Sequence, residues 1–102
     1  MSIEAALKKD KIILVASKEG RKGSLSINQD ADVYVAKFKS GEKYNFEMRS
    51  NRKGWIQIIK GSLKVGEMEL EAGDGLAVSD QSLLSMQAAA GAEFILFDLP
   101  PY

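Results

Sequence analysis

The sequence contains no cysteine and no histidine among its 102 residues. Without cysteine, the chain cannot form disulfides, thiolate nucleophiles or cysteine zinc sites. Without histidine, it lacks both the commonest metal ligand and the commonest general base at neutral pH. These two absences remove the side chains that nucleophilic and metal-dependent catalysis uses most often, and they favour a non-enzymatic role.

Charge of one sign is not in excess, because fourteen lysine and arginine residues balance fourteen aspartate and glutamate residues. A neutral chain gives no electrostatic reason to bind nucleic acid or an anionic membrane surface. No apolar run approaches the ~18 residues that a membrane span requires, and the N-terminus has no apolar core of signal-peptide length. We therefore expect a cytoplasmic protein with no nucleic-acid or membrane partner.

Proline is confined to positions 100 and 101, so it interrupts no earlier segment. From Lys11 onward, short runs of alternating apolar and polar residues are separated by glycine-centred turns, including turns at 60–62 and 73–75. This spacing favours a small antiparallel β-sandwich or barrel. About ten strands are expected, in the segments 12–16, 24–27, 33–38, 42–49, 55–59, 63–65, 67–71, 76–78, 83–88 and 94–99.

Two segments are ambiguous. Residues 1–10 are expected to form a short helix or the remnant of a linker, with Ser2 as the helix cap, which leaves 11–102 as one domain. Residues 83–90 contain three consecutive alanines, which are good helix formers. Leu84, Met86 and Ala88 nevertheless alternate with polar residues, so a strand is predicted there.

The glycine spacing resembles the first motif of cupins: Gly41, Gly54 and Gly61 fall on its frame, with Gly54 at the position of the motif's glutamate. Gly73-Asp74 begins a second cupin frame. Longer segments are similar to the C-terminal cupin domain of pirin-like, quercetinase-type proteins: GRKGSLSINQDADVYVAKFKSGE at 20–42, GWIQIIKGSLKVGEMELEAGDGLAVSD at 54–80 and AEFILFDLP at 92–100. The resemblance covers about residues 11 to 100. It implies an all-β fold, a small antiparallel cupin β-barrel.

The resemblance also implies a functional context. Pirin-like proteins resemble a tandem of two cupin domains, of which the N-terminal one normally carries a metal bound by histidine and glutamate. That half is linked in some members to quercetin 2,3-dioxygenase activity, whereas the C-terminal half is usually metal-free. This chain resembles the second half only, so the catalytic residues of the family have no matching positions here.

The cupin frame places Glu47, Arg49, Gly54 and Leu84 at the metal-ligand positions. A cupin metal requires imidazole and carboxylate ligands that converge on one ion, and an arginine beside the ion would repel it. We therefore expect neither a metal nor another cofactor, and no catalytic residue.

The same frame predicts what fills the barrel. Period-two alternation directs Ile56, Ile58 and Met86 inward together with the four frame positions. One interpretation is a packed apolar core with a Glu47–Arg49 ion pair near the mouth. The other is a vestigial pocket that binds a small anionic ligand through Arg49 and is lined by Glu47, Arg49, Ile56, Ile58, Leu84 and Met86.

The opposite face of the same strand carries Trp55, Gln57 and Ile59. These side chains are expected either to pack beneath a second layer or to form an interface, where exposed tryptophan is enriched. The leading hypothesis is a metal-free, non-catalytic cupin module that acts through protein contacts, as a homodimer or with a second, metal-bearing cupin. The alternative is a small-molecule-binding or quercetin 2,3-dioxygenase-type barrel.

Overall fold

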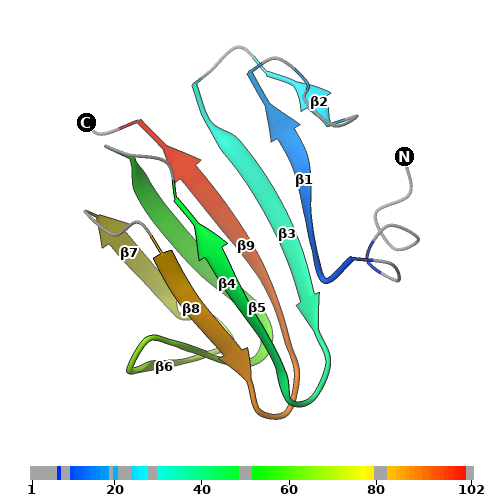
Figure 1. Ribbon diagram of the computed structural model, residues 1–102, viewed down its shortest axis with the longest axis vertical. Helices are drawn as coiled ribbons and strands as arrows, with labels where there is room; N and C mark the ends of the chain where they lie inside the picture. Colours follow the sequence, from blue (N-terminus) through cyan, green and yellow to red (C-terminus); the bar gives the residue numbers. More distant parts are fainter. Residues whose placement is uncertain are drawn as a thin grey trace.

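The computed structural model describes Leu7, Gly20 and the segments 10–18, 24–27, 30–48, 52–79 and 83–100. Most of the short helix or linker predicted for residues 1–10 therefore lies outside the described residues. The remainder is built from β-strands, as expected (Figure 1). They are β1 (Ile12–Ser17), β2 (Leu25–Ser26), β3 (Asp32–Phe38), β4 (Glu42–Glu47), β5 (Lys53–Val65), β6 (Met68–Glu71), β7 (Gly75–Ser79), β8 (Leu83–Ala88) and β9 (Ala92–Leu99).

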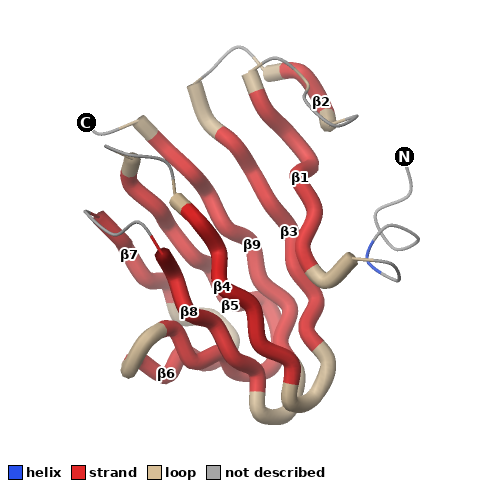
Figure 2. Tube along the Cα trace, in the orientation of Figure 1, coloured by secondary structure: helices blue, strands red, loops and turns tan. Residues whose placement is uncertain are grey.

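The strands form one curled sheet in the order β2-β1-β3-β9-β5-β8-β4, with β6 and β7 also paired to β5. All ladders are antiparallel except the short parallel pairing of β1 with β2. The sheet curls back on itself into a half-barrel, so that β4 and β8 lie in front of β5 in the view of Figure 2. We call the part formed by β2, β1, β3, β9, the first half of β5 and β7 the large sheet.

A single strand, β5, joins the large sheet to a smaller one, which consists of β4, β8, β6 and the second half of β5. The prediction of a turn at 60–62 is wrong, because β5 runs for 13 residues through this segment. Its register against β9 shifts between Ile58 and Lys60, and Gly61 has a φ of 76°. A β-carbon at Gly61 would clash with the carbonyl oxygen of Gly91. The glycine therefore bends a continuous strand at a bulge instead of ending it.

The ambiguous segment 83–88 is a strand, as predicted. β8 pairs with β4 over six residues, from Leu83 opposite Glu47 to Ala88 opposite Glu42. Its side chains alternate between exposed and buried, with Leu84, Met86 and Ala88 buried. The apolar alternation therefore outweighs the helix propensity of the alanines, since burial on one face stabilises the strand.

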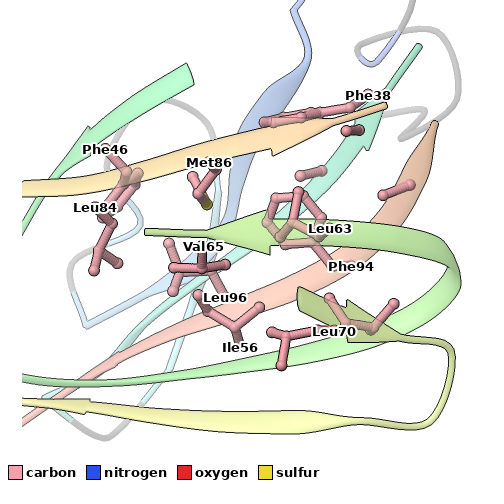
Figure 3. Packing of buried hydrophobic residues seen from close by; sticks show 14 of the residues in the cluster. Phe38, Phe46, Ile56, Leu63, Val65, Leu70, Leu84, Met86, Phe94 and Leu96 are labelled. Atoms are coloured by element: carbon pink, nitrogen blue, oxygen red, sulfur yellow. The ribbon is translucent and has the colours of Figure 1, made fainter. Parts of the chain in front are cut away.

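One apolar core fills the space between the two parts of the sheet (Figure 3). Aromatic side chains connect β3 to β4 on the other side of the core. Tyr34 meets Phe46 edge to face with 4.9 Å between ring centroids, and Phe38 lies 6.5 Å from Tyr44. Phe38 also contacts Phe94 at 5.2 Å. These contacts hold the curled sheet together where β3 and β4 have no ladder.

An exposed ion pair adds a polar link between the ends of the sheet. Lys11 Nζ lies 3.1 Å from Glu42 Oε2. The backbone amide of Lys39 donates a 2.6 Å hydrogen bond to Glu42 Oε1. The hydrogen bond from the Lys39 amide and the ammonium group of Lys11 lower the pKa of Glu42 below its ordinary value of 4.5.

Candidate functional site

The predicted pocket residues of β5 and β8 lie in the core. Ile56, Ile58, Leu84 and Met86 are 0–2% exposed. Figure 3 shows Ile56, Leu84 and Met86 among the packed side chains. The burial of these four residues agrees with the interpretation in which hydrocarbon fills the interior.

Glu47 does not join them. It is exposed and stands between the buried Phe46 and Met48, so the expectation that Glu47 points inward is wrong. The physical reason is the alternation of side chains along an extended chain, in which the two apolar neighbours take the inward positions. Arg49 lies outside the described residues, and so does the predicted Glu47–Arg49 ion pair. At Gly54, a β-carbon would sit 3.3 Å from Met48 Cε and 3.6 Å from Val78 Cβ.

The residues of the interior do not fit a cupin metal. The described frame positions supply an outward carboxylate, a glycine and a leucine, which cannot converge on an ion. No group of three or more acidic, histidine or cysteine side chains that could hold a metal occurs in the described part of the chain. The donor chemistry of a cupin metal centre is therefore missing from these positions.

An apolar row runs across the outer surface of the large sheet. Strand register places six residues side by side on successive strands from β2 to β7: Leu25, Ala16, Val33, Phe97, Trp55 and Ala77. The adjacent row holds Ile13, Val35, Ile95, Gln57 and Gly75. We call these two rows the outer face. Neither row contains a charged residue.

The outer face is accessible at several points along its length. Leu25 is 72% exposed and Trp55 is 39% exposed, whereas Ile95 and Phe97 are half-buried. Ile59, two residues after Gln57 on β5 and within the register shift, is 51% exposed. Charged residues flank the two rows at both ends of the strands: the exposed Lys53 precedes Trp55 on β5, and at the other end Lys60 Nζ is 4.0 Å from Glu93 Oε2.

Trp55 is held in one orientation by its neighbours. A β-carbon at Gly75 would clash with the indole ring, so the glycine gives Trp55 room to lie across β7. The indole Nε1 donates a 3.3 Å hydrogen bond to Gln57 Oε1. Gln57 Nε2 in turn donates to the carbonyl oxygens of Gly73 and Asp74, both at 3.2 Å. The orientation of the indole ring is therefore fixed by contacts within the chain.

A buried arginine, which sequence reasoning missed, ties together strand ends of the large sheet. Arg52 Nε donates to Asp98 Oδ1 at 2.7 Å, and Arg52 Nη1 donates to Asp30 Oδ2 at 2.9 Å. Arg52 Nη2 donates to the backbone oxygens of Asp30 and Asp98, at 3.1 and 3.0 Å. The side chains of Arg52 and Asp98 are 7% and 3% exposed.

Burial opposes the charge on Arg52, but the hydrogen bonds and charges of Asp98 and Asp30 outweigh it and raise the pKa of Arg52 above its ordinary value. Arg52 therefore stays a cation at any working pH. The only sequence signal for this cluster is Asp98, a charged residue at an inward position of an apolar strand.

Comparison with known proteins agrees with the fold and the resemblance. The family model of the quercetinase C-terminal cupin domain matches residues 14–99. The chain belongs to this family. Quercetin 2,3-dioxygenase of Escherichia coli K12 is 35% identical over 88 residues, which make up 86% of this chain and 38% of that protein. The pirin-like protein YhaK of the same strain is 30% identical over 100 residues, 93% of this chain and 42% of that protein.

Solved structures confirm the cupin fold. YhhW from Escherichia coli superposes with a TM-score of 0.86 at 34% identity, over 89% of this chain and 39% of YhhW. A cupin superfamily protein from Desulfitobacterium hafniense DCB-2 has a TM-score of 0.66 at 14% identity, over 89% of this chain and 79% of that one, and shares the fold. The chain thus spans about two fifths of the length of these curated relatives. No helix in its described part is long and apolar enough to cross a membrane.

Proposed function

We propose that this member of the quercetinase C-terminal cupin family is a metal-free, non-catalytic module. It acts through protein contacts and pairs with another cupin domain, either a second copy or a metal-bearing pirin-like cupin. A cytoplasmic location is part of the proposal. The observation that carries it is the apolar row across six strands of the outer face.

The apolar row supports a contact role because water solvates such a surface poorly. Scattered apolar residues are normal on any protein, but contiguous exposed patches mark interaction sites. Trp55 lies within the row with its orientation already set by Gly75 and Gln57. Preorganised aromatic side chains dominate binding energy at interfaces.

The packed interior supports a non-catalytic role. Ile56 and Leu84, which the cupin frame directs into the interior, are 0% and 2% exposed and leave hydrocarbon there. Titratable groups with strongly perturbed pKa values are typical of catalytic centres. In the described part of the chain the shifts belong to Glu42 and Arg52, each explained by a structural partner.

The first test concerns chemistry. The chain is purified without chelator, its metal content is measured by mass spectrometry, and oxygen uptake is followed with quercetin. YhhW has been solved in complex with nickel(II), so nickel is added in a parallel sample, with iron, copper and manganese in others. We expect far less than one metal per chain and no turnover above that of heat-denatured protein. Stoichiometric metal or flavonol turnover would contradict the proposal.

The second test concerns contacts and uses two matched variants. Ile59→Lys places a charge beside the outer face at a residue that is 51% exposed, and Leu83→Lys places one on β8 at a residue that is 50% exposed. Each tagged chain captures proteins from a lysate of the source organism, and mass spectrometry identifies them. We expect a cupin polypeptide, either untagged copies of this chain or a metal-bearing cupin, with wild type and Leu83→Lys but not with Ile59→Lys. Absence of any cupin from the wild-type sample, together with a purified chain that does not self-associate, would refute the contact role.

A further inference from the structure

We infer that the outer face binds the outer face of a second copy of this chain, so that two large sheets pack face to face with Trp55 in the contact. This inference rests on the proposed function and specifies its partner. The row that includes Leu25, Phe97 and Trp55 would lie in the centre of the interface.

The outer surface of the large sheet, which includes the strand ends that flank the two rows, is large enough for a weak dimer. Its five longer strands, β1, β3, β9, β5 and β7, at a spacing of about 4.8 Å, give a width of about 24 Å. Strands of five to eight residues give a mean length of about 22 Å at about 3.4 Å per residue. The footprint is then about 530 Å² per copy and about 1,100 Å² for the pair, just above the roughly 1,000 Å² expected of a specific interface. We therefore expect a dissociation constant in the micromolar range.

The chemistry of the face also suits a copy of itself. An isologous dimer needs a surface that is complementary to itself. Two apolar sheet faces meet this condition by interdigitating alternate side chains at about 10 Å separation, as in a β-sandwich. Because the two rows carry no charge, their centre can lose water without leaving an unpaired ion. Lys53 and the Lys60–Glu93 pair lie towards opposite ends of the strands, outside the two rows, where they would form the polar rim of the footprint.

Sedimentation velocity between 1 and 200 μM tests the inference on the purified wild-type chain. We expect a concentration-dependent rise from 11.2 kDa towards twice that mass. Ile59→Lys and Ile95→Lys should each weaken the association at least tenfold, whereas Leu83→Lys should leave it unchanged. Far-ultraviolet circular dichroism and thermal unfolding establish that each variant is folded. Ile59→Lys keeps the test valid if the half-buried Ile95 does not tolerate a charge.

The outcomes distinguish failure of the proposed dimer from failure of the contact role. A wild-type chain that stays monomeric at 200 μM overturns the inference, and capture of a metal-bearing cupin in the previous experiment would still support the contact role. A dimer that both lysine variants leave intact uses another surface and also overturns the inference. If the chain is monomeric and captures no cupin, the inference and the proposed function fail together.

Discussion

Removal of the Arg52 guanidinium should destabilise the protein more than any exposed charge substitution. In Arg52→Met, the side chain keeps its bulk but loses four hydrogen bonds to Asp98 and Asp30. The carboxylate of Asp98 stays 3% exposed in the native arrangement, so it loses its cation in a place where water cannot replace it.

The expected cost follows from this burial. Breaking a buried ion pair by removing one partner costs about 3–5 kcal/mol, against a total stability of roughly 5–15 kcal/mol for a domain. At about 4–8 °C per kcal/mol for a domain of this size, the melting temperature should fall by at least roughly 12 °C. Arg52→Lys should recover only part of the loss, because one ammonium cannot reach the four acceptors that the planar guanidinium joins.

Asp30→Asn provides the control. Its carboxylate contacts the same arginine but is 56% exposed, so its loss should cost only about 0–1 kcal/mol. Urea and thermal unfolding, both followed by circular dichroism, give the free energies. A loss below about 1 kcal/mol for Arg52→Met, or equal losses for Arg52→Met and Asp30→Asn, would refute the reasoning that burial gives this contact its energy.

Two further predictions concern the backbone and pH. Gly61→Ala should cost about 1–3 kcal/mol or more in urea unfolding, because strain at positive φ adds to the clash with the Gly91 carbonyl. Gly41→Ala, at a φ of 81° with no atom within 4 Å of the new β-carbon, should show the backbone strain alone, and an equal loss in both variants would argue against the clash. The lowered pKa of Glu42 stabilises the fold at neutral pH. The stability difference between wild type and Glu42→Gln should therefore shrink as the pH falls below 4.5, and a difference that is independent of pH would exclude the ion pair as its source.

The strands could be predicted from the sequence because each one buries a single face. In 83–88, apolar and polar residues alternate in the sequence, and buried and exposed side chains alternate in the structure. In 94–99, buried and half-buried side chains alternate. The turn at 60–62 was predicted wrongly because a glycine at positive φ serves a bulge as well as a turn. Whether Gly61 forms a bulge or a turn depends on the close approach of Gly91, which is distant from it in the sequence.

The errors at the candidate site have the same origin. Glycine spacing placed Glu47 inside, whereas its neighbours Phe46 and Met48 determine that it faces out. The Arg52–Asp98 contact joins residues 46 positions apart, for which no local pattern exists. Trp55 was identified as an outward residue, but the apolar row that it belongs to requires the register of six strands.

Oxidative footprinting at increasing protein concentration tests the role in protein contacts, because it measures whether the outer face becomes covered. Trp55 is 39% exposed on that face, and Met68 is 54% exposed on β6. The oxidation rate of Trp55 should fall as copies associate, whereas the oxidation rate of Met68 should stay constant. Constant rates for both residues up to 200 μM, or protection of Met68 alone, would contradict it.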